Sequence, residues 1–194
     1  MRERKIGKVF AYLIFVKSAV FIERDGILNL VRIENGHPVP PLRRSDFRLN
    51  LEAIQPIRQL RLAGFKLIVT TNQPWLSHGC LSRYELERMH EQLRQAFPID
   101  DILVCPHEEM DECPCRKPLP GMFIEAAAMW HLDISRSFVL SDKWQDAEAA
   151  RRIGCISVLV RSPWTGKGHH DFLAPNLAAA VGIIKQWQPS PQYA

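Results

Sequence analysis

The chain has 194 residues, of which 46% are hydrophobic and 24% are charged. This balance is that of an ordinary globular protein, and it excludes wholesale disorder and a collagen-like fibre. Lys and Arg number 25 against 21 Asp and Glu, which gives a net charge of +4. So small a basic excess suits an anionic small molecule as well as a nucleic acid. Since only scattered arginines support the second, we expect no nucleic-acid partner.

A basic start and an apolar run over residues 9–16 open the chain. This pattern is similar to a short signal peptide, but Lys17 closes the run and no small-residue cleavage site follows. The run is also too short to cross a membrane. We therefore expect an N-terminal extension over residues 1–18, one domain over residues 19–187 and a tail over residues 188–194. The protein is expected to be cytoplasmic, with no membrane partner.

Strand-like and helix-like stretches alternate from residue 19 onward. Apolar runs predict strands at residues 19–23, 66–71, 137–140 and 156–160, with a brief one at 102–104. Helical periodicity predicts helices at residues 51–63, 82–96, 120–131, 144–153 and 176–187. Ser82 and Glu85 have capping-box spacing, and Gly64 and Gly154 end their helices. The Pro-rich residues 30–48 are expected to form a long loop.

This alternation predicts a parallel sheet with helices on both of its faces. In such sheets, ligands bind at the carboxyl ends of the strands. Polar residues follow the predicted strands at these ends: Glu23 and Asp25, Thr71 and Asn72, Lys117, and Asp142. We therefore expect these side chains to converge on one site.

Carboxylates at two strand ends suggest a cation site. Glu23 and Asp25 are two residues apart, so strand alternation points both side chains the same way. Such a pair can hold a hard cation and divide the roles of nucleophile and general acid, with Asp142 as a further ligand. A solvated turn would equally explain the first pair, and helix capping would explain Asp142. Their common placement favours the site.

Three cysteines and a histidine lie within one short stretch. They are Cys105, His107, Cys113 and Cys115. A single loop with this spacing can wrap tetrahedrally around one Zn²⁺ ion, although a chance cluster of free thiols is the alternative. No acidic general base lies in helical register with the four residues. We therefore expect a closed, structural zinc site that fixes the following Arg116 and Lys117 in place.

Together, these residues resemble the haloacid dehalogenase-like phosphohydrolases, in the branch of the heptose bisphosphate and histidinol-phosphate phosphatases. The four motifs of that family occur in order: VFIERDG at 20–26, TTNQ at 70–73, CRKPLPG at 115–121 and LSDKWQD at 140–146. The zinc loop is a mark of this branch. The resemblance covers residues 19–161 and implies a Rossmann-like fold. Without a sizeable insertion between the motifs, we expect no large cap domain.

The resemblance implies a Mg²⁺-dependent phosphatase that acts on a sugar phosphate or a similar small metabolite. Its acyl-phosphate chemistry would use Glu23 as the nucleophile and Asp25 as the acid and base. The residues expected to hold Mg²⁺ are Glu23, Asp25 through its carbonyl, and Asp142. The residues expected to bind phosphate or substrate are Thr71, Asn72, Gln73, Arg116, Lys117 and Lys143.

One departure from the family stands at the nucleophile, where Glu23 replaces the usual Asp. A Glu can form an acyl phosphate and bind Mg²⁺, but its extra methylene moves the carboxylate by roughly an ångström, which can cost about a hundredfold in rate. Two hypotheses stay open: an adapted or weakened phosphatase, and a relative that binds a phosphorylated ligand without turnover. The chain retains the family's residues at Asp25, Asn72, Lys117 and Asp142. This favours retained chemistry or retained ligand binding over simple loss of function. We expect a monomer.

Overall fold

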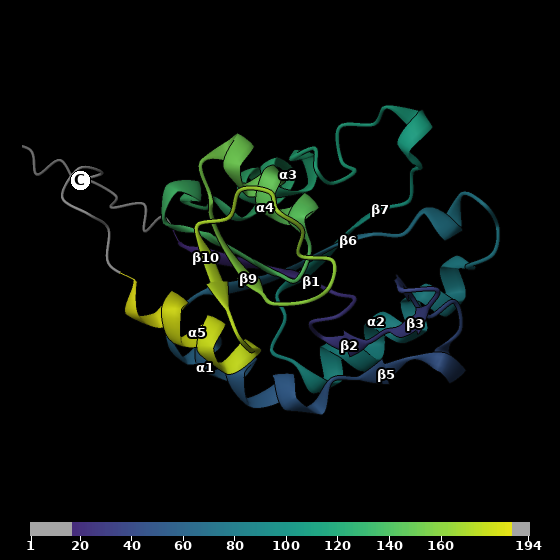
Figure 1. The fold of residues 1–194 in the computed structure, drawn as a ribbon, viewed down its shortest axis with the longest axis horizontal. Coiled ribbons are helices and arrows are strands. Elements are labelled where there is room, and N and C mark those ends of the chain that lie inside the picture. The colour runs from purple at the N-terminus through teal and green to yellow at the C-terminus, as the bar shows by residue number, and fades with distance from the viewer. Residues whose placement is uncertain (1–16, 188–194) are drawn as a thin grey trace, which may run out of the picture.

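The computed structural model describes residues 17–187. The expected tail and all but the last two residues of the expected N-terminal extension lie outside this range. A six-stranded parallel sheet forms the centre of the molecule (Figure 1). Its strands, in spatial order, are β10 (Phe172–Ala174), β9 (Ile156–Val160), β8 (Phe138–Ser141), β1 (Ala19–Glu23), β6 (Lys66–Asn72) and β7 (Asp101–Cys105).

Helices cover both faces of this sheet, as expected from the sequence. On one face pack α1 (Ile54–Leu62), α2 (Arg83–Ala96) and α5 (Leu177–Gln186), and on the other α3 (Gly121–Trp130) and α4 (Trp144–Ile153) (Figure 1). The central strand β1 contributes side chains to the hydrophobic cores on both faces of the sheet. Val20 and Ile22 point into one core, and Ala19 and Phe21 point into the other. The predicted fold class is confirmed.

The order of the strands places a crevice at the middle of the sheet. From β1 the chain runs through β6 to β7 on one side, then crosses over to β8 and continues through β9 to β10 on the other. Ligands of open parallel sheets bind where the strand order reverses in this way. The carboxyl ends of β1, β6 and β8 therefore meet at one edge.

Two regions differ from the sequence-based prediction. Strand β10 was not expected, because it has only three residues and is recognisable only from its pairing with β9. Residues 30–48 are not a plain loop, since they take part in two short antiparallel pairs, β2 (Asn29–Leu30) with β5 (Arg48–Leu49) and β3 (Arg32–Glu34) with β4 (His37–Val39). Asn35 and Gly36 turn the second pair with positive φ angles of 51° and 78°. An Asn-Gly turn is a strong hairpin signal.

Short 3₁₀ turns complete the described structure. They cover Arg44–Asp46, Leu51–Ala53, Pro74–Leu76, Glu109–Asp111 and Ile134–Arg136. Across residues 17–187, no helix has the length and apolar character that a bilayer span requires.

Candidate active site

Glu23 is the last residue of β1 and is buried, with 4% of the residue's surface exposed. Its Oε1 accepts hydrogen bonds from the backbone N–H groups of Arg24 (2.9 Å) and Asp25 (3.1 Å). Its Oε2 contacts the ammonium group of Lys117. The longer side chain is thus accommodated by curling back over its own backbone.

Charge around Glu23 keeps it ionised. Burial by itself raises the pKa of Glu23, but the ammonium groups of Lys117 and Lys143 outweigh burial and lower that pKa to about 2. At neutral pH the side chain is therefore a carboxylate. A nucleophile or a metal ligand needs this form.

Lys117 is the cation at the centre of the buried cluster. Its Nζ contacts Glu23 and donates hydrogen bonds to Asp146 Oδ1 (2.6 Å) and to the carbonyl of Thr70 (2.9 Å). Burial opposes a charged lysine, yet the two carboxylates raise the pKa of Lys117 above its usual value. Asn72 holds the Lys117 backbone from β6, accepting from its N–H (3.2 Å) and donating to its carbonyl (3.1 Å).

Asp146 belongs to this cluster but was not among the predicted site residues. It lies in the first turn of α4 and is fully buried. Burial raises the pKa of Asp146 to about 6, even though Lys117 pulls in the opposite direction. The signal in the sequence was its position in the first turn of the helix predicted at residues 144–153, directly after the strand end that carries Asp142.

Asp25 is held from three directions. Arg24 binds both carboxylate oxygens through Nη2 (3.0 and 2.9 Å), Asn29 donates to Oδ1 (3.0 Å), and Gln73 donates to Oδ2 (2.8 Å). The guanidinium of Arg24 is itself completely buried. Sequence reasoning missed Arg24, because an arginine beside a turn usually extends into solvent.

The structure places two predicted phosphate-binding residues elsewhere. Gln73 and Thr71 are completely buried beneath Asp25, and the Gln73 amide joins that carboxylate to the Thr71 hydroxyl (2.9 Å). Neither residue lines the cavity of about 220 Å³ that is bordered by Glu23 and Lys117 and is described below. The Gln73 N–H group is thus paired within the interior, as buried polar groups usually are.

A cation position lies between the ends of β1 and β8. The Lys143 Nζ reaches it, contacting the carbonyl oxygen of Asp25 and Asp142 Oδ1 (2.8 Å for the latter). Burial opposes the charge on Lys143, but Glu23 and Asp142 raise its pKa above the usual value. The donors around this position are carboxylate and carbonyl oxygens, which are the ligands that Mg²⁺ prefers. The residues present therefore fit that ion.

A cavity of about 220 Å³ opens over these groups. Its floor includes Glu23, Lys117 and Asp146, and Arg116 and Trp75 form part of its wall. Arg116 is oriented by a hydrogen bond from Nη1 to the carbonyl of His107 (3.0 Å). Positive charge over a carboxylate floor suits a phosphorylated ligand.

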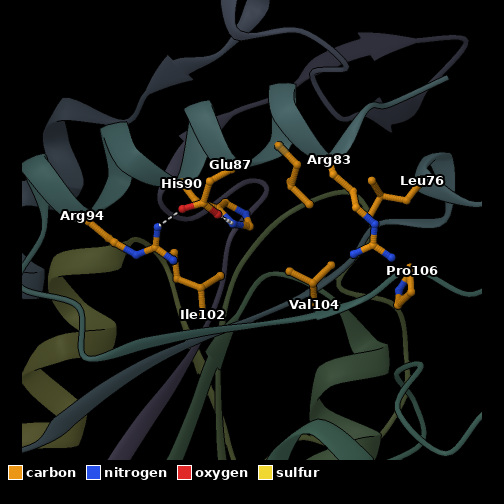
Figure 2. A pocket seen from close by; sticks show the side chains of 9 residues that line it. Leu76, Arg83, Glu87, His90, Arg94, Ile102, Val104 and Pro106 are labelled. Atoms are coloured by element: carbon orange, nitrogen blue, oxygen red, sulfur yellow. Dashed lines mark hydrogen bonds and ion pairs between the residues drawn. The ribbon is translucent and has the colours of Figure 1, made fainter. Parts of the chain in front are cut away.

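A larger cavity, of about 330 Å³, lies between α2 and β7 (Figure 2). Arg83, Glu87, His90 and Arg94 reach it from the helix, with Ile102 and Val104 on the strand side. It contains none of the predicted site residues. Its volume does not single it out, since cavities of about 440 and 400 Å³ lie elsewhere on the described surface. The cluster of ionised groups at the strand ends points instead to the cavity of about 220 Å³.

The four predicted zinc ligands lie together at the end of β7. Cys113 Sγ is 3.6 Å from Cys105 Sγ and 3.4 Å from Cys115 Sγ, and His107 Nδ1 is 3.3 Å from Cys115 Sγ. A tetrahedral zinc with Zn–S bonds of about 2.3 Å separates its ligand atoms by about 3.5–3.8 Å. The donor set and its spacing therefore fit zinc.

Known proteins are similar to this chain in sequence and in fold. A family profile described as HAD-hydrolase-like matches residues 114–181. The D-glycero-β-D-manno-heptose-1,7-bisphosphate 7-phosphatase of Pseudomonas aeruginosa is 33% identical over 163 residues, covering 78% of this chain and 84% of that protein. The enzyme of the same name from Escherichia coli K12 is 31% identical over 194 residues, covering 90% and 97%.

A solved structure agrees with the sequence comparisons. The D,D-heptose 1,7-bisphosphate phosphatase from B. bronchiseptica, complexed with magnesium and phosphate, superimposes with a TM-score of 0.74 at 26% identity. The match covers 87% of this chain and 98% of that one. Fold and site thus define the class, a phosphoric monoester hydrolase. The chain belongs to the haloacid dehalogenase-like phosphatase family, and the resemblance expected from its four motifs is confirmed.

Proposed function

We propose that the protein is a Mg²⁺-dependent phosphatase that hydrolyses a phosphomonoester of a sugar, of the heptose bisphosphate kind. The observation that carries this proposal is the ionised carboxylate of Glu23, which faces Lys117 beneath the cavity and lies beside the cation position. The heptose bisphosphate phosphatases named above support the substrate class.

In the proposed reaction, a carboxylate oxygen of Glu23 attacks phosphorus while the bond from phosphorus to the sugar oxygen breaks. Asp25 donates a proton to that leaving oxygen. Asp25 then takes a proton from water, whose oxygen attacks the phosphorus of the acyl phosphate. Inorganic phosphate leaves and the Glu23 carboxylate is restored. Lys117 offsets the negative charge of the phosphoryl oxygens throughout.

Glu23, the carbonyl of Asp25, and Asp142 would hold Mg²⁺. When bound, this ion supplies positive charge between the carboxylates and the phosphoryl group. Cys105, His107, Cys113 and Cys115 would hold a structural Zn²⁺, with no part in the reaction.

A second candidate function is binding of a phosphorylated ligand without turnover. The same side chain favours it, because both oxygens of Glu23 are already engaged, one by backbone N–H groups and one by Lys117. Freeing an oxygen for attack would break one of these charge-assisted bonds.

Phosphate release with Mg²⁺ over a panel of sugar phosphates and histidinol phosphate separates the two functions. The natural protein is compared with Glu23→Asp and Asp25→Asn. We expect turnover by the natural protein, loss of at least a hundredfold in Asp25→Asn, and a gain of about a hundredfold in Glu23→Asp, which restores the shorter carboxylate.

Activity in Glu23→Asp alone, together with binding of the same compound by the natural protein, would overturn the phosphatase in favour of the binding protein. Silence of all three proteins together with absence of ligand binding would overturn both. Calorimetry with each compound of the panel supplies the binding measurement.

We also propose that the protein is a monomer and that it resides in the reducing environment of the cytoplasm. All five cysteines lie among the described residues and none of them forms a disulfide, a pattern typical of reducing conditions. Sedimentation of the purified protein measures its oligomeric state directly.

A further inference from the structure

The loop after β9 reaches back to Asp142, although the two segments are far apart in sequence. The indole Nε1–H of Trp164 donates a hydrogen bond to Asp142 Oδ2. The hydroxyls of Ser162 (2.8 Å) and Thr165 (3.2 Å) both donate to the backbone carbonyl of Asp142. This loop therefore holds both the main chain and the side chain of one residue.

The two carboxylate oxygens of Asp142 have different partners. Oδ1 faces the cation position, where it accepts from Lys143 Nζ (2.8 Å). Oδ2 faces the Trp164 indole, and it also lies against Gly26, where an added Cβ would stand only 2.5 Å from it. With Oδ2 enclosed in this way, only Oδ1 is directed at a cation.

The Trp164 bond is sheltered from solvent. Asp142 is 3% exposed and Thr165 is 5% exposed, while the indole is partly buried beside them. A hydrogen bond to a charged group is stronger than one between neutral groups, and more so where water is excluded. The bond can therefore fix the rotation of the carboxylate.

We propose that Trp164 is a positioning residue for the Mg²⁺ site, holding Asp142 Oδ2 so that Oδ1 faces the ion. This inference rests on the proposed function, because it requires that Asp142 bind Mg²⁺. Partners that orient a metal ligand without touching the metal typically contribute ten- to a hundredfold to metal affinity. Loss of the indole N–H is expected to have that effect here.

Titration calorimetry of Mg²⁺ into the full chain, without substrate, tests the proposal. Trp164→Phe keeps an aromatic ring and removes the N–H, so its Kd for Mg²⁺ should rise about tenfold or more. Trp144→Phe is the matched control, since Trp144 lies two residues from Asp142 but makes no hydrogen bond to it. Its Kd for Mg²⁺ should stay within twofold of the natural value.

A second measurement uses the natural protein, so that it stands even where Trp164→Phe folds poorly. The chain has five tryptophans, and ¹H–¹⁵N NMR follows the indole N–H of each. The Trp164 signal should shift on Mg²⁺ addition more than that of the distant Trp187. An unmoved Trp164 signal, or equal Mg²⁺ affinity in Trp164→Phe and the natural protein, would overturn the proposal while leaving the phosphatase intact. A natural protein that binds no Mg²⁺ would overturn the proposed function, and the role of Trp164 with it.

Discussion

At the scale of single residues, the site depends on one lysine shared by two buried carboxylates. The side chains of Lys117 and Asp146 are each 1% exposed and that of Glu23 is 5% exposed. Burying charges costs free energy, and the attraction to Lys117 compensates for it only while all three groups are present. The low pKa of Glu23 and the raised pKa of Asp146 both arise from this arrangement.

Replacing Lys117 with Met should destabilise the protein by about 3–5 kcal/mol at pH 7, because two buried carboxylates lose their counter-charge. The free energy of unfolding in urea measures this loss. The difference in stability between the natural protein and the variant should become smaller below pH 5, because the unpaired carboxylates of the variant take up protons there. Lys185→Met, at an exposed lysine of α5, is the control and should change stability by less than about 0.5 kcal/mol. Equal effects of the two substitutions would contradict the shared-lysine account.

At the scale of elements, α2 carries a buried histidine toward the sheet (Figure 2). His90 is 3% exposed, and its Nε2 has no hydrogen-bond partner among the described residues. Burial, followed by the nearby charges of Arg24 and Arg94, lowers the pKa of His90 to about 3. Glu87 lies 4.0 Å from its Nδ1 and is too distant to reverse this. The helix therefore packs with a neutral imidazole.

Stability should accordingly fall in mild acid. The folded-state pKa of His90 lies below its unfolded value of 6.5, so the unfolded chain binds more protons between about pH 6.5 and pH 3. Between pH 7 and pH 5, protonation of His90 in the unfolded chain should lower the free energy of unfolding by about 2 kcal/mol. His90→Gln, which does not titrate, should lose that much less stability than the natural protein over the same interval. Urea unfolding at each pH measures the difference, and parallel curves for the two proteins would refute it.

At the scale of the whole molecule, the cluster of Cys105, His107, Cys113 and Cys115 connects the sheet to the site. Cys105 ends β7, and Cys115 directly precedes the Arg116 and Lys117 that reach the cavity. A metal ion at the cluster would thus tie together the loop between β7 and α3 and hold the backbone of Lys117 in place. Structural zinc sites stabilise the fold directly.

We therefore expect about one zinc per chain in protein purified without chelator. Removing it, or replacing Cys113 with Ser, should lower the melting temperature by several degrees and weaken ligand binding through displacement of Lys117. Cys80→Ser is the control, because Cys80 is exposed and outside the cluster, and it should retain full zinc content. Elemental analysis and thermal melting measure both effects. A zinc-free protein that melts like the untreated one would exclude the structural role.

Much of the fold was predictable because its signals are local. Helix α4 and strand β9 have the bounds expected from periodicity and from the Gly154 stop, whose φ of 72° suits glycine. The N-cap of α2 forms as expected, with Ser82 Oγ accepting from the Glu85 N–H (3.1 Å). The Glu85 carboxylate, however, accepts from the backbone of Arg44 rather than from its own helix. That partner is distant in sequence, so the spacing alone does not reveal it.

The sequence by itself determined the fold class, the strand ends that meet at the site, and the thiol cluster, because periodicity and motif spacing depend only on neighbouring residues. Only the tertiary structure decided how the site residues pair. It placed the Gln73 side chain in a hydrogen bond with Asp25 instead of in the cavity. It also paired Asp146 with Lys117, and it placed the Trp164 indole in a hydrogen bond with Asp142. These pairings join segments 22 to 48 residues apart. The physical reason is that buried polar groups must find partners wherever the packed chain offers them, and their spacing along the chain does not specify which.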